Sequence, residues 1–141
     1  MKENSFLNIV LVYPQIPNNT GNIGRLCVGC NAKLHLVKPL GFEITDTKLK
    51  RAGLDYWKDL DLNIHESFED LLTTISNKDR MFLLSAKATT SIYKTDFKKG
   101  DWLLFGKEAE GLSLEIQENF QEKVFEVKNR YKKGVLDEYL K

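Results

Sequence analysis

Short apolar runs recur along the chain, separated by turns rich in Pro, Gly, Asn and Asp. Each run is compact and contains mostly Leu, Ile, Val and Phe, which is typical of a strand buried on both faces. The runs predicted to form strands are "LNIVLVY" (7–13), "KLHLVKP" (33–39), "LNIH" (62–65), "RMFLLSA" (80–86) and "DWLLFG" (101–106).

Between these runs, the spacing of apolar residues favours helices. Ser67 and Ser113 stand where helix N-caps are expected, and Glu69 and Asp70 suit the positive end of a helix dipole. We predict a turn over residues 18–22. The predicted helices cover about residues 23–31, 47–53 with Thr45 or Asp46 as cap, 68–75, 113–120, and a final segment that places Val124, Val127 and Tyr131 on one face.

Alternating strands and helices predict an α/β fold, with a mainly parallel sheet flanked by helices in a single domain over residues 1–141. The sequence contains no internal repeat, low-complexity segment or interdomain linker. In such sheets, ligands bind beyond the carboxyl ends of the strands. The loops after Tyr13, Ala86 and Gly106 are therefore the places to look for chemistry.

The charge balance does not identify a partner, because Lys and Arg total 21 against 20 for Asp and Glu. Basic residues do gather at 48–51 ("KLKR") and 128–133 ("KNRYKK"), although a solvated helix face explains either cluster equally well. The N-terminus lacks the features of a signal peptide, and no apolar run reaches the length of a membrane span. With only two cysteines, a disulfide framework is not expected. We expect a cytoplasmic protein without a membrane partner.

The C-x-x-C pair, Cys27 and Cys30, raises the question of a metal or redox site. A zinc site needs about four ligands, and only His35 and His65 could complete it. Those histidines fall on separate predicted strands at no recognisable spacing. A redox pair would open a helix, whereas this pair lies near a helix end. We therefore expect no metal, and two cysteines that pack a helix against the sheet.

The stretch "NTGNIGR" supplies Asn19, Gly21, Asn22 and Arg25 directly after the first predicted strand. Its glycines permit close backbone approach, and the asparagines can hydrogen-bond a phosphate or a sugar. The G-x-G-x-x-G spacing of a dinucleotide site is absent. From spacing alone, a helix cap followed by a surface arginine remains an equally good interpretation.

A second loop of interest is "LLFGKEAEGLS", where a buried strand runs into Gly106, Glu108 and Gly111. Such a tight turn exposes main-chain groups that can hold the edge of an adenine ring. On its own this loop is a weak signal, since many strand-to-helix turns share it.

Taken together, "LNIVLVYPQIPNNTGNIGRLC", "KLHLVKPLGF", "KLKRAGLDYW" and "WLLFGKEAEGL" resemble the SPOUT class of RNA methyltransferases. The similarity covers about residues 7–112. It is greatest to the group that 2′-O-methylates the wobble nucleotide (cytidine or uridine 34) of tRNA. The resemblance implies a C-terminal trefoil knot, S-adenosylmethionine as methyl donor, and a homodimer with its active site at the subunit interface.

The resemblance also implies residue roles. The positions that match the motif handling the RNA nucleotide are Asn19, Gly21, Asn22 and Arg25. Those that match the cofactor site are Leu84 and Gly106, through their backbone, and Glu108 and Gly111 of the second motif.

Arg25 is a poor general base because a guanidinium stays protonated. We assign it to orienting the ribose or phosphate and to stabilising the developing alkoxide. The proton acceptor stays open. Lys48, Lys50 and Arg51 are reasonable phosphate contacts.

The third motif of the family is missing from this sequence. Members carry a further strand with an Ile-Pro-Met-like run and then a cofactor loop before the final helix. Here "NFQEKVFEVKNRYKKG" passes directly between helices, with the break near residues 123–125. Either the protein lacks this stretch or the sequence omits a segment there. The second explanation is favoured, because loss of a sheet strand would expose core on the scale of the whole net stability.

The expected activity is methyl transfer from S-adenosylmethionine to a ribose 2′-OH of tRNA, with the wobble nucleotide as target. A non-catalytic RNA-binding member that has lost the donor pocket is the alternative. A nucleotide-binding α/β protein unrelated to RNA is a weaker rival, because "NTGNIGR" and "KLKRAGLDYW" occur together. The sequence does not indicate which tRNA is modified.

Overall fold

The computed structural model describes residues 6–44, 57–85, 96–107, 111–119 and 124–126. None of the helices in these ranges is long and apolar enough to cross a membrane. In chain order, the elements are β1 (Leu7–Val12), α1 (Pro17–Gly29), β2 (Lys33–Val37), η2 (Trp57–Asp59), β3 (Leu62–His65), α3 (Phe68–Thr74), η3 (Lys78–Arg80), β4 (Met81–Ser85), β5 (Asp101–Phe105), α4 (Leu114–Asn119) and β6 (Val124–Glu126).

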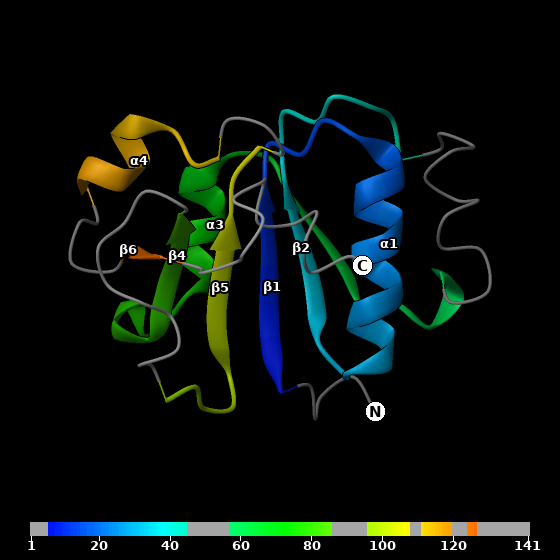
Figure 1. Ribbon diagram of the computed structural model, residues 1–141, viewed down its shortest axis with the longest axis horizontal. Coiled ribbons are helices and arrows are strands. Elements are labelled where there is room, and N and C mark those ends of the chain that lie inside the picture. Colours follow the sequence, from blue (N-terminus) through cyan, green and yellow to red (C-terminus); the bar gives the residue numbers. More distant parts are fainter. Residues whose placement is uncertain (1–5, 45–56, 86–95, 108–110, 120–123, 127–141) are drawn as a thin grey trace.

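The described strands form one six-stranded sheet in the order β3-β2-β1-β5-β4-β6, and all neighbouring strands in it run parallel (Figure 1). The central register aligns Val10 of β1 with His35 of β2 and with Leu104 of β5. The predicted α/β fold with a parallel sheet is confirmed. Strands predicted from apolar runs end within two residues of the observed bounds, because an apolar run is what a doubly covered strand requires.

Two apolar cores cover the two faces of the sheet. On one face, α1 contributes Ile23 and Cys27 to a cluster with Leu11, Leu36 and residues of β4 and β5. On the other face, α3 and α4 contribute residues that pack on Val10, Val12 and Leu104. In Figure 1, α1 lies in front of the sheet and α3 behind it. Alternating side chains of each strand therefore enter opposite cores.

The predicted caps of the two rear helices are confirmed. The hydroxyl of Ser67 accepts a hydrogen bond from the amide of Asp70 at 3.1 Å. The hydroxyl of Ser113 accepts one from the amide of Ile116 at 3.3 Å. Each cap satisfies an amide that the first turn of a helix would otherwise leave without a partner. The predicted helix over residues 47–53 lies outside the described residues.

Two expectations about the polypeptide path are wrong. Residues 18–22 are helical, because α1 begins already at Pro17. Val124 belongs to β6 rather than to a helix, and it pairs with Leu83 of β4. The sheet therefore has a strand where the sequence indicated a deletion. That finding removes the argument that an exposed core requires an omitted segment; Val127 and Tyr131 lie outside the described residues.

At the amino ends of β4 and β5, an ion pair links the buried carboxylate of Asp101 to Arg80, whose side chain is 32% exposed. The carboxylate of Asp101 accepts hydrogen bonds from Arg80 Nε at 2.8 Å and Nη2 at 2.6 Å. It also accepts one from the amide of Lys98 at 2.6 Å. Asp101 is 1% exposed, and the Arg80 guanidinium lies 4.9 Å above the ring of Phe82. We call Asp101, Arg80 and the Lys98 amide the amino-edge clamp.

Candidate functional site

Helix α1 begins at the carboxyl edge of the sheet, beyond the end of β1 (Figure 1). Pro17 suits the first helical position, because that position needs no N–H donor and already favours the helical φ. Ile16, the N-cap residue, provides no side-chain hydrogen bond, and the first turn has no acidic residue. The positive pole of α1 thus lacks both a side-chain cap and a first-turn carboxylate. This setting suits an anionic group such as a phosphate.

Three of the residues predicted to handle RNA lie on the outward half of α1. Asn19 and Asn22 are half-buried, and Arg25 is exposed. Their spacing of three residues makes each a neighbour of the next along the helix surface. Gly21, the fourth residue of the predicted set, is buried, unlike the other three. We call Asn19, Asn22 and Arg25 the α1 polar stripe.

Arg25 lies farther from the helix start than the sequence suggested. Because α1 begins at Pro17, Arg25 lies about 12 Å along the helix axis from it, at 1.5 Å per residue. The amide end of α1 and the guanidinium of Arg25 are therefore two separate positions for negative charge. A nucleotide is large enough to contact both.

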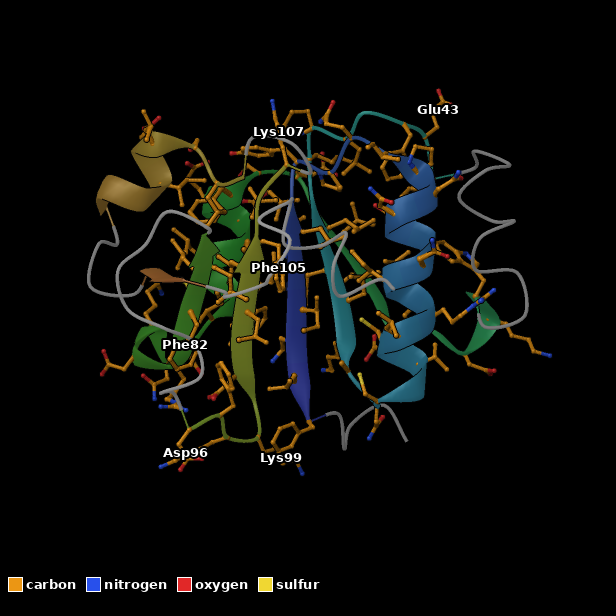
Figure 2. All side chains as sticks on the ribbon, viewed as in Figure 1. Glu43, Phe82, Asp96, Lys99, Phe105 and Lys107 are labelled. Carbon is orange, nitrogen blue, oxygen red and sulfur yellow. The ribbon has the colours of Figure 1, made fainter. Side chains whose placement is uncertain are left out.

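The loop after β5 closes on itself directly beyond Phe105. Lys107 and Gly111 exchange two backbone hydrogen bonds, at 3.1 and 2.7 Å. A Cβ atom placed on Gly106 would lie 2.0 Å from the carbonyl carbon of Gly111 and 2.0 Å from the amide nitrogen of Leu112. Only glycine fits there, and Gly111 has a φ of +74°. Figure 2 shows Lys107 at the same edge of the molecule as Glu43.

Leu84, the other predicted cofactor residue, lies near the carboxyl end of β4, on the strand next to β5. Its side chain is 3% exposed and belongs to the core on the α1 side. Only its backbone is thus positioned for a ligand. Gly106 and Leu84 lie near the carboxyl ends of adjacent strands, and the main chain there fits a flat ring held without side chains. The cofactor role of these residues stays a prediction.

Several predicted site residues lie outside the described residues. These are Lys48, Lys50, Arg51 and Glu108, together with the basic stretch 128–133.

Tyr13, which directly follows β1 at the same carboxyl edge, was not recognised from the sequence as a candidate site residue. Tyr13 has a φ of +57°, a left-handed conformation that is rare for a bulky residue. Its amide donates to the carbonyl of Val37 at 3.0 Å, and Gln15 Nε2 donates to its carbonyl at 2.9 Å. Burial, followed by the charges of Glu69 and Glu115, raises the pKa of its phenol. Strained backbone of this kind gathers at functional sites, but no sequence pattern reveals it for a tyrosine.

The two cysteines differ, so the prediction that both pack is right for one only. Cys27 is buried in the core, and burial, reinforced by Cys30, raises the pKa of its thiol to about 12. Cys30 is exposed past the end of α1, and its thiol donates to the carbonyl of Leu26 at 3.0 Å. Within the described ranges, no group of three or more His, Cys, Asp or Glu residues could hold a metal ion.

The two histidines, which the sequence placed on separate strands at no recognisable spacing, lie next to each other in the sheet. His35 and His65 lie on the neighbouring strands β2 and β3, and His35 Nδ1 is 2.9 Å from His65 Nε2. Strand register brings them together, and residue spacing could not show this.

Comparisons with known proteins agree with this arrangement. The SpoU rRNA methylase family matches residues 6–132. A tRNA (cytidine(34)-2′-O)-methyltransferase of Methylovorus glucosotrophus (strain SIP3-4) is 45% identical over 113 residues, which cover 80% of this chain and 73% of the relative. A relative with the same name from Acidovorax sp. (strain JS42) is 45% identical over 114 residues, which cover 80% of this chain and 70% of that relative.

Solved structures show the same fold. One described as "Structural insights into the 2-OH methylation of C/U34 on tRNA" has a TM-score of 0.83 at 40% identity, covering 90% of this chain and 82% of that one. The SpoU methyltransferase AviRb from Streptomyces viridochromogenes, in complex with AdoMet, has a TM-score of 0.71 at 19% identity. The match covers 89% of this chain and 49% of that one. At that identity, the second likeness concerns the fold alone. Because the family match extends over most of the sequence and the relatives exceed 40% identity, the chain belongs to the SpoU rRNA methylase family.

Proposed function

We propose that this protein transfers a methyl group from S-adenosylmethionine to a ribose 2′-OH of tRNA, at the wobble nucleotide, position 34. The names of the relatives, which specify cytidine(34), support the target. The observation that carries the proposal is the α1 polar stripe beside the carboxyl edge at which the Gly106 loop closes. That edge is where parallel α/β sheets bind ligands.

Arg25 acts on the RNA in this proposal. Its guanidinium stays protonated, so it orients the ribose or phosphate and stabilises the alkoxide that develops as the 2′-OH loses its proton. Asn22, three residues before Arg25, can hydrogen-bond the same nucleotide. The acceptor of the hydroxyl proton is not assigned to a residue.

The main chain at Leu84, Gly106 and Gly111 would hold S-adenosylmethionine. When bound, this cofactor supplies an electrophilic methyl group. The protein's part is to hold the 2′-OH in line with that group, and such positioning accounts for much of the rate. The closed turn at Gly106 suits this task, because close contact with the backbone of Gly111 and Leu112 fixes its main chain.

The proposal includes a homodimer with a shared active site. Arg25 is exposed on the outer side of α1, and its apolar neighbour Leu26 is 46% exposed. A second protomer that packs its carboxyl edge against this side of α1 would bring its Gly106 loop to Arg25. The same contact would cover Leu26.

The proposal also includes the trefoil knot and a cytoplasmic location. In support of the knot, β6 lies beyond β4, on the side away from β5. The polypeptide must therefore cross β4 somewhere between β5 and β6, a crossing that a threaded C-terminal segment would also require. For the location, the sequence-based expectation is the only support.

The test is methylation of a tRNA by wild type, Arg25→Ala and Arg25→Lys. We expect Arg25→Ala to lower kcat by about 10²- to 10³-fold, as for loss of one stabilising donor. Arg25→Lys keeps the charge without the planar fork, so we expect an intermediate loss. Lys99→Ala, an exposed residue at the opposite edge (Figure 2), is the matched control and should retain full activity. Full activity of Arg25→Ala would refute its role.

Two further readouts separate the alternatives. An unchanged thermal midpoint for Arg25→Ala shows that any loss is chemical, whereas loss of fold would make the residue structural. Calorimetry with S-adenosylmethionine and with tRNA tests the non-catalytic alternative. Binding of tRNA without binding of the donor would support an RNA-binding member, and tight donor binding would eliminate it.

A further inference from the structure

A line of hydrogen-bonded polar side chains crosses the rear face of the sheet, where Asn63 also lies beside His35 in the register of β2 and β3. His65 Nε2 lies 2.9 Å from His35 Nδ1, and His35 Nε2 lies 3.0 Å from Asn8 Oδ1. The side-chain amide of Asn8 donates to the carbonyl of Gly100 at 3.2 Å. We call His65, His35, Asn8 and this carbonyl the His–Asn network. It connects β3, β2, β1 and the turn before β5, and the proposed function uses none of its members.

The direction of every hydrogen bond in the network is determined by its last member. The carbonyl of Gly100 can only accept, so Asn8 faces it with the amide nitrogen and presents its oxygen to His35. His35 must then carry its proton on Nε2, which leaves Nδ1 as an acceptor. His65 accordingly carries its proton on Nε2 and has a lone pair on Nδ1. Both neutral imidazoles are thus restricted to one tautomer.

Little else in the surroundings can stabilise charge on His35. His35 is 5% exposed, and the ring of Trp102 lies 4.5 Å from its ring, between centroids. The charged groups that act on the pair are Lys33 of β2, which opposes a charge on His35, and Asp70 of α3, which favours one on His65. Strands β1 and β5 contribute the uncharged Asn8 and Trp102.

The two histidines respond differently to a proton. A proton added to His65 Nδ1 leaves every bond of the network intact and makes Nε2 a stronger donor. A proton added to His35 Nδ1 turns the acceptor of the His65 bond into a donor. A neutral His65 can still accept from it by carrying its own proton on Nδ1, whereas a charged His65 presents a second donor. Protonation of His65 is therefore compatible with the network, and protonation of His35 after it breaks the network.

We propose that the His–Asn network is an acid-sensitive latch, which holds the edge strand β3 and its neighbour β2 to the centre of the sheet and opens when His35 gains a proton. The carbonyl of His65 accepts from the amide of Lys38 at 2.9 Å, so the latch also fixes the point where β2 leaves the sheet. In the sequence, the segment that follows carries Lys48, Lys50 and Arg51.

The sign of the pH effect follows from the protonation of His35 in the two states. Burial, then the charges of His65 and Lys33, lower the pKa of His35 to about 3 in the folded protein, against 6.5 when unfolded. The folded state therefore excludes a proton that the unfolded state accepts. The contribution of His35 to the free energy of unfolding is complete above pH 6.5, and it falls as the pH drops toward 3. Between pH 7 and pH 5, the folding equilibrium constant should fall about 25-fold from this residue.

The first experiment is nitrogen-15 NMR of the two imidazoles in the wild-type protein. We expect His35 to show a single Nε2–H tautomer from pH 8 to pH 5, while His65 gains a proton on Nδ1 within or below that range. A mixture of tautomers at His35, or its titration near pH 6.5, would overturn the latch. This measurement requires no variant, so a variant that fails to fold cannot obscure it.

The second experiment compares denaturant unfolding of wild type, His35→Gln and His65→Gln from pH 7 to pH 5. In His35→Gln, position 35 no longer carries a titratable side chain, so the pH dependence of unfolding should lack the 25-fold component. His65→Gln retains an N–H donor for His35 Nδ1 and should keep that component. Asn8→Leu removes the acceptor of the His35 N–H, so NMR should show mixed tautomers at His35. Equal pH dependence of wild type and His35→Gln would contradict the proposal.

Discussion

The two edges of the sheet are built on different principles. At the amino edge, the amino-edge clamp satisfies both oxygens of a buried carboxylate, and Arg80 also donates to the carbonyl of Asp96 at 3.0 Å. At the carboxyl edge, the chain turns tightly at Tyr13 and Gly106, and α1 begins without a side-chain cap. Charge is neutralised within the protein at the first edge, whereas the second edge presents backbone groups in strained turns.

This difference separates stability from function. A fully paired buried cluster can join strands but offers nothing to a ligand. Strained or uncapped backbone costs stability, and it persists where a ligand makes use of it. We therefore expect substitutions at the amino edge to change stability while the folded protein keeps its activity. At the carboxyl edge, substitutions should change donor or RNA binding.

The largest effect is expected for Gly106→Ala. The added Cβ would meet backbone atoms at 2.0 Å, so the loop must move rather than adapt a side chain. We expect a loss of at least about 3 kcal/mol of unfolding free energy, together with loss of S-adenosylmethionine binding. Denaturant unfolding and calorimetry measure the two effects. Unchanged donor binding would show that the tight turn serves the fold alone.

A smaller effect is expected for Asp101→Ala. The substitution removes the acceptor of three hydrogen bonds at a site that is 1% exposed. We expect the unfolding free energy to fall by about 2–3 kcal/mol, with kcat on tRNA unchanged at a temperature where the variant is folded. Asp59→Ala, at an exposed position, is the control and should be neutral. A tenfold drop in kcat for Asp101→Ala would contradict the expectation that the amino edge affects stability alone.

The smallest effect, of opposite sign, is expected for Gly29→Ala at the far end of α1. No atom lies within 4 Å of the Cβ that would be added there. A gain of about 0.5 kcal/mol in unfolding free energy should follow, since alanine restricts the unfolded chain. The melting midpoint measures it against Gly106→Ala, which introduces the same methyl group at the other edge. A loss at Gly29 would mean that this position also makes contacts in an assembly.

The sequence predicted the parts of the fold that depend on local pattern. Apolar runs located the strands, and Ser67 and Ser113 located two helix starts, because burial and capping act over a few residues. The start of α1 was missed, since Asn and Gly favour turns, although Pro17 is a signal for the first helical position. Strand β6 was missed because three residues within a charged stretch carry little periodicity.

The candidate site could be proposed where chemistry follows from residue type. Gly106 and Arg25 were singled out from the sequence, because few residues can replace a glycine in a tight turn or an arginine facing a phosphate, and their roles stay predictions. Tyr13 and the His–Asn network were not found. No sequence pattern predicts that a tyrosine adopts a left-handed backbone conformation. His35 contacts His65 only because of the register of β2 against β3. Long-range pairing of this kind depends on the whole sheet.

The amino-edge clamp also determines how the protein should respond to ionic strength. Salt screens exposed charges, such as the Lys38–Glu66 pair at 3.0 Å, whose side chains are 44% and 72% exposed. It screens Asp101 far less, because that side chain is 1% exposed. Contacts between basic residues and RNA phosphates weaken steeply as salt rises. Concentrated salt should therefore strip tRNA from the protein while its sheet stays folded, so that bound RNA can be removed without denaturation.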